Sequence, residues 1–470
     1  MKSVSHRTVC PEKLSRRQFL RLAAVAGGSA SFLLPSRLRA VSPNSKLNHA
    51  CIGVTRMGAT DLNNFMNHDR VNIVALCDVD AQHLAKAAKL VPGARLYADW
   101  REMFAQEGDR IDSVNVTVPD HNHFPIAYTA IQHGKHVYCQ KPMCHDLWEV
   151  RTLTTAAIHK GVVTQLGIQH SSSIADRMTV EIIKAGVIGK IRHVYLSSTR
   201  SAINRIKGPR PATGEPPPAE LNWDLWIGTA SMRPFAPDIY HPATWRGWQD
   251  FGTSWCADMG PHIFDATWRS LGLKAPATVT ARVEEAWQNT PARRTDNWPQ
   301  SEQVTWTFPG NQLIDGQELT VDWFDGAFDV PTDIRELVPK EAREQFQRKG
   351  RKEYYPQEAA LLVGTDGVLL KEIESAPVLF PQDKFKGYAR PKMPGQNHYH
   401  QFVDACLGGA PTTAHFAQTG PMIEAILLGT VAIRCPDQKL AWDAAAMKIP
   451  NYAEAERYLK RTYRAGWEIG

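Results

Sequence analysis

The chain has 470 residues, of which 43% are hydrophobic and 22% are charged. This composition excludes a disordered chain, a collagen and a disulfide-stapled miniprotein, and the length is typical of two domains. The formal charge of +6 is concentrated in residues 1–40, whose eight basic residues and one acid give +7 and leave −1 for the remainder. The sequence therefore predicts no nucleic-acid partner, because such a partner needs a basic surface.

Residues 1–40 are predicted to be a signal peptide. Residues 15–20 (SRRQFL) form a twin-arginine signature, and a weakly apolar stretch of 13 residues follows at 22–34. That stretch is shorter than the roughly 20 helical residues that cross a bilayer, and we expect no later membrane span. We predict cleavage near Ala40, a periplasmic or otherwise exported protein, and no permanent membrane anchor. A membrane anchor or a disordered tail is the alternative interpretation of this leader.

Cysteine usage predicts a chain without structural disulfides. Of the eight cysteines, Cys10 leaves with the leader, and the remaining seven are an odd number with no C-x-x-C pair. Cys51, Cys77 and Cys139 fall on strands that we expect to be buried, where a thiol behaves as a small hydrophobic group.

The first part of the mature chain alternates between strand and helix patterns. Short apolar runs predict strands at 49–54, 72–77, 113–118 and 136–139, and helical periodicity predicts helices at 59–67, 82–90 and 124–133. Strands separated by helices of this length form a parallel sheet with right-handed crossovers. We therefore predict a doubly wound α/β domain over residues 41–165.

The pattern changes after Gly167. Helices are predicted at 175–185, 399–407 and 422–434, and strands at 191–199, 303–308, 318–324 and 359–370, the last with a turn at 365–367. The charged residues 332–358 are expected at the surface. Residues 166–470 are therefore predicted to be an α+β domain with a mostly antiparallel sheet.

A glycine turn follows the first predicted strand. It reads Gly53-Val54-Thr55-Arg56-Met57-Gly58. In a G-x-G-x-x-G turn the glycines let the backbone approach a pyrophosphate, and the next helix supplies free N–H groups. Thr55 replaces the middle glycine and would crowd the phosphates, whereas Arg56 is able to offset this by reaching a phosphate oxygen.

Asp78 ends the second predicted strand, twenty residues after Gly58. This spacing suits an acceptor for the ribose hydroxyls of a dinucleotide, although the residue is also placed to cap the next helix. A carboxylate at this point favours NAD over NADP, because it would repel a 2′-phosphate.

Three further motifs carry a family resemblance. They are Thr117-Val118-Pro119-Asp120-His121-Asn122-His123, Cys139-Gln140-Lys141-Pro142 and Asp258-Met259-Gly260-Pro261-His262. Together with the C-terminal tail they resemble the Gfo/Idh/MocA family (glucose–fructose oxidoreductase and inositol dehydrogenase), particularly its exported members. The resemblance spans nearly the whole mature chain, although Thr55 and Gln140, which replaces the usual glutamate, depart from the family pattern.

The resemblance implies a Rossmann domain, NAD(P)-dependent chemistry on sugars or polyols, and a C-terminal sheet that often forms oligomer contacts. We therefore expect a homo-oligomer with a carbohydrate substrate and NAD. The expected cofactor contacts are Gly53, Thr55, Arg56, Met57, Gly58, Asp78, Pro119, His123 and Gln140. Because Gln140 removes a negative neighbour of Lys141, we expect that lysine to be less firmly held as a cation.

Lys141, Asp258 and His262 are the predicted catalytic residues. Lys141 follows a strand on the ligand-binding side of the sheet and is able to donate to the reacting oxygen. Pro261 suits the first turn of a helix, so a helix is expected to begin near Gly260. Asp258 and His262 would then face one cleft, with His262 as general base and Asp258 binding or orienting the substrate. His241 and Tyr240 are alternative bases.

Several alternatives remain open from the sequence alone. Transient oxidation of a sugar would permit redox-neutral cleavage, which suits an exported enzyme with no pool of cofactor, but net dehydrogenation is also possible. Thr55 also permits another interpretation. The protein would then be a cofactor-poor carbohydrate-binding or degenerate family member, or an NAD-independent sugar lyase. Trp245 and Trp248 either stack on a sugar or belong to the core. The pairs His121/His123 and His398/His400 lack a clear third ligand, so no metal is expected.

Overall fold

The computed structural model describes residues 45–199, 208–344 and 356–469. The predicted signal peptide, including its cleavage site and Cys10, lies outside these residues, as does part of the charged stretch 332–358.

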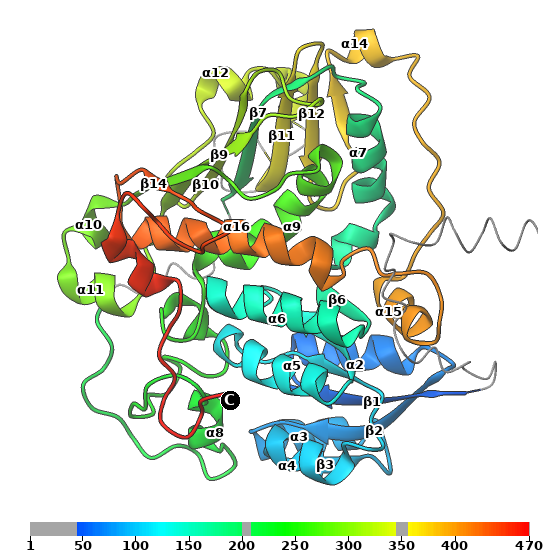
Figure 1. Ribbon diagram of the computed structural model, residues 1–470, viewed down its shortest axis with the longest axis vertical. Helices are drawn as coiled ribbons and strands as arrows, with labels where there is room; N and C mark the ends of the chain where they lie inside the picture. Colours follow the sequence, from blue (N-terminus) through cyan, green and yellow to red (C-terminus); the bar gives the residue numbers. More distant parts are fainter. Residues whose placement is uncertain (1–44, 200–207, 345–355, 470) are drawn as a thin grey trace, which may run out of the picture. The chain divides into compact units, whose positions relative to one another are not determined.

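The N-terminal domain is built on a six-stranded sheet in which all neighbouring strands are parallel (Figure 1). The strand order is β3-β2-β1-β4-β5-β6. The strands are β1 (Leu47–Ile52), β2 (Val71–Cys77), β3 (Arg95–Tyr97), β4 (Ser113–Val116), β5 (His136–Gln140) and β6 (Thr164–Gly167). The predicted parallel α/β domain is therefore confirmed, and the boundary proposed at residue 165 falls inside β6.

Helices connect these strands. They are α2 (Met57–Met66), α3 (Ala81–Ala88), α4 (Trp100–Glu107), α5 (His123–Gln132) and α6 (Leu147–Lys160), with a 3-10 turn η1 (Asp120–Asn122) before α5. The helices predicted at 59–67, 82–90 and 124–133 are confirmed as α2, α3 and α5, whereas α4 and α6 were not predicted. Asp80 caps α3, because its side chain accepts hydrogen bonds from the backbone N–H groups of Gln82 and His83.

The C-terminal domain contains an eight-stranded mixed sheet with the order β13-β12-β11-β7-β10-β9-β8-β14. Only the β7–β10 pair is parallel among the described strands, and the other pairs are antiparallel. The strands are β7 (Ile191–Ser198), β8 (Thr278–Val283), β9 (Glu302–Pro309), β10 (Glu318–Asp325), β11 (Glu358–Gly364), β12 (Val368–Glu372), β13 (Val378–Phe380) and β14 (Leu440–Ala441). The predicted mostly antiparallel sheet is confirmed.

The principal helices of this domain are α7 (Ile174–Lys184), α9 (Ser254–Leu271), α15 (His398–Cys406) and α16 (Phe416–Arg434). The predicted start of a helix near Gly260 was wrong, because α9 begins six residues earlier and Pro261 lies inside it. A proline in that position removes one backbone donor from the helix. Asp258 and His262 are thus both interior residues of α9, one turn apart.

Short helical segments complete the described chain. They are η2 (Gln169–Ser172), α8 (Trp223–Ile227), η3 (Thr244–Gly247), α10 (Glu285–Gln288), α11 (Pro291–Asp296), α12 (Thr332–Arg335), α13 (Lys340–Glu344), α14 (Gln382–Phe385) and η4 (Ala453–Tyr458).

Helix α16 joins the two domains. It packs against α9 and strands β8 and β9 of its own domain and against α6 and β6 of the N-terminal domain (Figure 1). Among the described helices it is the one long and apolar enough to cross a membrane, which corrects our expectation that no later stretch would be. Within the fold, 83% of that apolar window is buried, so its hydrophobicity is accounted for by core packing.

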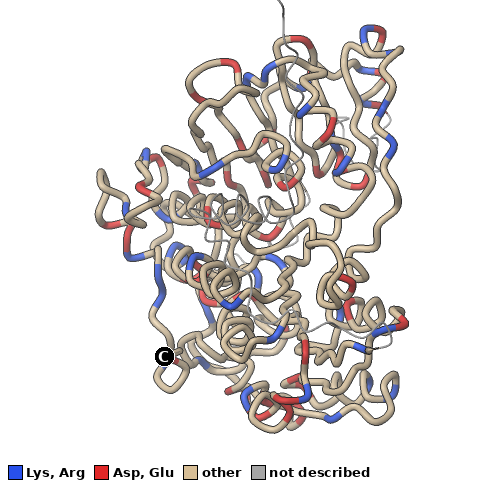
Figure 2. Tube along the Cα trace, turned by 45° about the vertical axis from the view of Figure 1, so that its right-hand side comes forward, with Lys and Arg blue, Asp and Glu red and all other residues tan. Residues whose placement is uncertain are grey.

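The cysteines of the described chain are buried. The seven from Cys51 to Cys435 are free thiols, and the burial predicted for Cys51, Cys77 and Cys139 is confirmed. Figure 2 shows Lys and Arg intermixed with Asp and Glu along the described chain.

Candidate functional site

A deep pocket lies at the carboxyl ends of the parallel strands. Its volume is about 1190 Å³, part of it open to solvent. Ile52, Cys77 and Gln140 line it from the ends of β1, β2 and β5, and Thr117 lines it just after β4. The opposite wall comes from the C-terminal domain through Leu225, Trp226, His241, Pro242, Trp245 and Arg246. Ligands of doubly wound sheets bind at this edge.

The glycine turn lines the pocket. At two of its positions a side chain larger than that of glycine would clash with the backbone. Gly53 has a φ of +81°, and a Cβ there would lie 2.1 Å from the carbonyl oxygen of Thr117. A Cβ on Gly58 would lie 2.1 Å from the carbonyl oxygen of Gly53. Both distances are far below van der Waals contact, so the close approach of β1, α2 and β4 depends on these glycines. This part of the turn fits a dinucleotide.

Thr55, Arg56 and Met57 also line the pocket. The replacement of the middle glycine by Thr55 is therefore located on the surface that a pyrophosphate would approach. Arg56 has a φ of +50° and directly precedes α2.

Asp78 lines the pocket at the end of β2. Its Oδ2 accepts a hydrogen bond from the N–H of Val54 at 3.0 Å, and its Oδ1 accepts one from the N–H of Asp80 at 3.0 Å. Burial raises the pKa of Asp78 above its ordinary value. Because Asp80 caps α3, the alternative role of Asp78 as the helix cap is wrong, and its carboxylate is left facing the pocket.

Lys141 and Asp258 are brought together, as the motifs predict. The Lys141 Nζ donates to Asp258 Oδ1 at 2.9 Å and to the Asp258 carbonyl oxygen at 2.8 Å. Arg246 Nε lies 3.4 Å from the same Oδ1. Burial alone would raise the pKa of Asp258, but Lys141 and Arg246 outweigh burial and lower that pKa to about 2. Asp258 thus supplies Lys141 with an ion-pair partner, and the expected effect of Gln140 on this lysine stays a prediction.

Asp120 is an ionisable residue of this pocket. It belongs to the motif at residues 117–123, but the sequence predicts no role for it. It is buried, lines the pocket and accepts a hydrogen bond from Thr253 Oγ1 at 2.9 Å. Burial and the neighbouring Asp258 raise its pKa to about 7. Asp120, Lys141, Arg246 and Asp258 therefore form one cluster of ionisable groups, and the first three of them line the pocket.

This raised pKa predicts a pH-dependent stability. The folded chain keeps a proton on Asp120 that the unfolded chain loses above the ordinary pKa of 3.8. The contribution to stability is complete below that value and is lost as the pH rises through about 7. We expect Asp120→Asn to raise the free energy of unfolding at pH 8 by up to about 4 kcal/mol and to change it little at pH 4.

Denaturant unfolding of the wild type and the variant across this pH range measures the effect. The exposed Asp69 supplies a control variant, Asp69→Asn. An Asp120→Asn stability difference that does not change with pH would contradict the assignment.

His262 does not line this pocket. It lines a second, smaller cavity of about 200 Å³ together with Asp176 and Lys371, which form an ion pair of 2.8 Å. The shared cleft that we expected for Asp258 and His262 stays a prediction. His262 lies one turn after Asp258 on the same face of α9, but it lines the smaller cavity beside α7, whereas Asp258 holds Lys141. Burial, followed by Lys141 and His170, lowers the pKa of His262 well below its ordinary value.

The remaining predicted cofactor contacts divide into two groups. Pro119 and Gln140 line the pocket, and the Gln140 Nε2 donates to buried Asp61 at 3.0 Å. His123 is buried outside the pocket lining. Its Nδ1 lies 2.7 Å from the Pro142 carbonyl oxygen and its Nε2 lies 2.8 Å from the Val118 carbonyl oxygen. The prediction of a cofactor contact for the His123 side chain was therefore wrong, because both ring nitrogens face the backbone that shapes the pocket.

The structure also locates the tryptophans and histidines that were considered as sugar-stacking or metal-binding residues. Trp245, Trp248 and Tyr240 all belong to one buried aromatic cluster, and of these three Trp245 also lines the pocket. The histidine pairs at alternate residues lie on helical segments and not on strands, so their rings do not share a face. His121 Nε2 lies against the Trp226 carbonyl oxygen and His398 Nδ1 against Ser172 Oγ.

The C-terminal tail supports the floor of the pocket. Arg461 binds the carbonyl oxygen of His121, which lies between pocket residues Asp120 and Asn122, and donates to Glu149 Oε1 at 3.0 Å. Arg464 Nε donates to the Gly228 carbonyl oxygen at 3.0 Å. The last residues of the chain therefore hold the two pocket walls together.

Comparison with known proteins identifies both domains. Residues 47–168 match the model described as an oxidoreductase family, NAD-binding Rossmann fold, and residues 178–322 match that of an oxidoreductase family, C-terminal alpha/beta domain. A glycosyl hydrolase family 109 protein of Stenotrophomonas maltophilia is 33% identical over 151 residues, covering 29% of this chain and 32% of that protein. A levoglucosan dehydrogenase of Pseudarthrobacter phenanthrenivorans is 27% identical over 124 residues, covering 26% and 31%. The chain therefore matches about a third of the length of these curated relatives.

A solved structure has a similar two-domain fold over most of this chain. The WlbA dehydrogenase of Bordetella pertussis, in complex with NADH and UDP-GlcNAcA, superposes with a TM-score of 0.57 and 15% identity, covering 85% of this chain and 99% of the other. The fold and the pocket define a two-domain oxidoreductase with an NAD-binding Rossmann domain. Within that class, the chain belongs to the Gfo/Idh/MocA family.

Proposed function

We propose that this protein is an NAD-dependent enzyme that acts on a sugar, a polyol or a glycoside. The observation that carries the proposal is one continuous pocket that begins at the glycine turn and Asp78 and ends at Lys141. The levoglucosan dehydrogenase and the glycosyl hydrolase family 109 protein support a carbohydrate substrate.

The residues that would hold the cofactor are those of the turn and of the strand ends. Gly53 and Gly58 provide the close backbone approach, and Asp78 provides a carboxylate for the ribose hydroxyls. Since that carboxylate would repel a 2′-phosphate, we infer a preference for NAD over NADP. When bound, NAD supplies the acceptor for a hydride from the substrate.

Lys141 and Asp120 are the groups proposed to handle the substrate's hydroxyl group. The Lys141 ammonium, fixed by Asp258, is placed to donate a hydrogen bond to the reacting oxygen and to stabilise the negative charge that develops there. Asp120, whose pKa is about 7, is able to take up the hydroxyl proton near neutral pH. The role of His262 as general base stays a prediction, because this residue lies on the second cavity.

Redox-neutral glycoside cleavage is the finer proposal. In that reaction the sugar is first oxidised to a ketone, the acidified neighbouring C–H permits elimination, and water addition and re-reduction complete the cycle. It suits an exported enzyme, because the cofactor returns to its starting state. Net dehydrogenation of the same class of substrate is the alternative, and the two differ in whether reduced cofactor accumulates.

Export through the twin-arginine route is part of the proposal and rests on the leader at residues 1–40. We expect a double variant, Arg16→Lys with Arg17→Lys, to remain in the cytoplasm when expressed in a host with this export route. Cell fractionation measures the outcome. Undiminished export of the double variant would argue against a twin-arginine signal.

A cofactor-poor carbohydrate-binding protein is the second candidate, and the position of Thr55 on the pocket wall favours it. Native mass spectrometry of the purified protein, followed by titration with NAD, separates the two candidates. Retained NAD(H) or saturable binding of added NAD supports the enzyme. A protein that retains no NAD(H) and binds no added NAD supports the carbohydrate-binding protein.

The same titration gives a prediction for Thr55. We expect Thr55→Gly to bind NAD roughly tenfold more tightly than the wild type, because removing the β-branched side chain relieves crowding worth on the order of 1 kcal/mol. Thr55→Ala is the matched control, since it removes the branch and keeps a Cβ. Weaker binding by Thr55→Gly would indicate that the threonine contributes a contact to the dinucleotide.

A further inference from the structure

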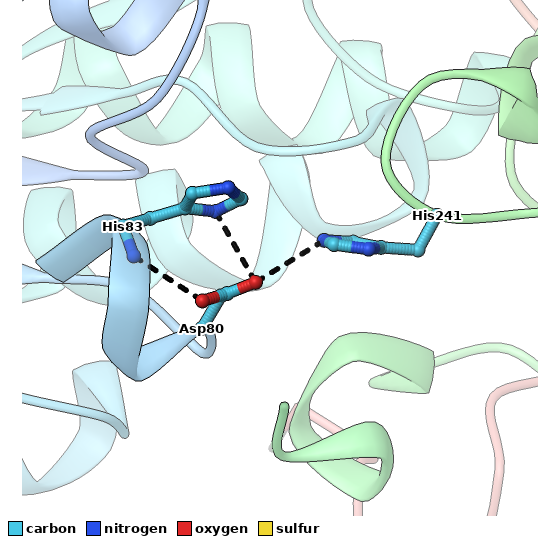
Figure 3. Close-up of side chains that lie close together, drawn as sticks. All are labelled: Asp80, His83 and His241. Atoms are coloured by element: carbon cyan, nitrogen blue, oxygen red, sulfur yellow. Dashed lines mark hydrogen bonds and ion pairs between the residues drawn. The ribbon is translucent and has the colours of Figure 1, made fainter. Parts of the chain in front are cut away.

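Three side chains of metal-ligand types lie close together beside the main pocket, which two of them, His83 and His241, line (Figure 3). They are Asp80 and His83, at the start of α3, and His241, from the segment of the C-terminal domain that forms the opposite wall. One ligand atom from each lies within 4.8 Å of the other two. Asp80 and His241 are far apart in the sequence, so no spacing could have shown this group.

The distances within the group suit a shared cation better than direct hydrogen bonds. His83 Nδ1 lies 3.5 Å and His241 Nε2 lies 3.9 Å from the same oxygen, Asp80 Oδ2. Both exceed the usual 2.7–3.2 Å of an N–H···O bond. Ligand atoms about 2.0–2.1 Å from a tetrahedral zinc ion are separated by about 3.3 Å. Movements of well under an ångström bring both imidazoles to that separation from the carboxylate oxygen.

The carboxylate is already oriented for this role. Asp80 Oδ1 accepts hydrogen bonds from the backbone N–H groups of Gln82 at 2.9 Å and His83 at 3.2 Å. These bonds fix the carboxylate and turn Oδ2 toward the two imidazoles, as the outer-shell partners of metal ligands do. Asp78 Oδ1, at 4.0 Å from His83 Nδ1, adds a second negative charge beside the group.

We propose that Asp80, His83 and His241 form a binding site for a divalent transition-metal ion of the zinc class. Two imidazoles and one carboxylate are a ligand set that zinc accepts, and a fourth position remains for water or a bound ligand. His83 and His241 both line the main pocket, so that position is open to it. The ion would also fasten the His241 segment to the N-terminal domain. This site goes beyond the proposed function and does not depend on it.

Titration with Zn²⁺ tests the site in the full mature chain, without dinucleotide. We expect one ion per chain by calorimetry and an increase in melting temperature on addition of Zn²⁺. His241→Gln and His83→Gln should each weaken binding by at least the roughly 10- to 100-fold that loss of an outer-shell partner costs. Because Asp80 also caps α3, the histidine variants are the cleaner test.

His133→Gln, a variant of an exposed histidine in the same domain, is the matched control and should bind Zn²⁺ like the wild type. A wild type that binds no Zn²⁺, or variants at His83 and His241 that bind as the wild type does, would overturn the site. An equal loss of Zn²⁺ affinity in His133→Gln would also overturn the site. Titration with NAD, carried out separately, reports on the proposed function alone.

Discussion

Replacing Lys141 with methionine is expected to lower kcat by roughly 10²- to 10⁴-fold. The ammonium is the charged donor at the end of the pocket, and Asp258 holds it at 2.9 Å. Methionine keeps most of the side-chain volume and removes the charge, while Arg246, 3.4 Å from the same carboxylate, still faces Asp258. We therefore expect the fold and the binding of NAD to survive the substitution.

The measurement is the rate of turnover with a sugar, polyol or glycoside obtained from a substrate screen. Melting temperature and NAD affinity serve as controls for folding. Lys141→Arg keeps a positive donor that faces Asp258, so kcat should fall less than in Lys141→Met if the charge of Lys141 stabilises the reacting oxygen. Full activity of Lys141→Met would remove this residue from the mechanism.

Replacing Gly53 with alanine is expected to lower the free energy of unfolding by at least about 3 kcal/mol, since it combines backbone strain with a steric clash. The new Cβ would lie 2.1 Å from the Thr117 carbonyl oxygen at a φ of +81°. The backbone must then shift where β1, α2 and β4 meet the pocket. We expect NAD affinity to fall by about 100-fold or more, because the phosphate cradle moves with the turn.

Gly93 provides the matched control for this substitution. Its φ is +95°, yet a Cβ there would meet no atom within 4 Å. Gly93→Ala should therefore cost only the left-handed backbone strain, about 1–2 kcal/mol, and leave NAD affinity unchanged. Denaturant unfolding and NAD titration of both variants make the comparison. Equal effects at the two positions would contradict the steric argument.

Periodic segments of the fold could be predicted from the sequence. The strands at 72–77 and 191–199 are β-branched runs whose burial and period are visible locally, and both were found close to the expected limits. The three-residue strand β3 has no period of its own and is defined by pairing with β2. The start of α9 was misplaced because Pro261 was interpreted as a first-turn residue, whereas the buried surroundings of α9 tolerate it inside the helix.

Predicted site residues that lie at neighbouring strand ends, among them Gly53, Asp78 and Lys141, do line one pocket. The hydrogen bond between Lys141 and Asp258 was not predicted, because Asp258 lies in helix α9 and meets Lys141 only through the packing of the two domains. The side chains of Arg246 and His241 come from a segment without regular periodicity, so their approach to the pocket depends on tertiary packing. The cavity that His262 lines could not be predicted, because Asp176 of α7 and Lys371 of β12 come together there only through tertiary packing.

The contacts of Arg461 and Arg464 have a consequence for the order of folding. Arg461 binds the carbonyl oxygen of His121, which lies between Asp120 and Asn122, and Arg464 binds the carbonyl oxygen of Gly228. Domains generally fold in order as they leave the ribosome, but these two contacts can form only once residues 461–464 have been synthesised. A nascent chain that already contains the complete N-terminal domain thus still lacks this support for its binding cleft, and we expect the cofactor to be captured after that stage.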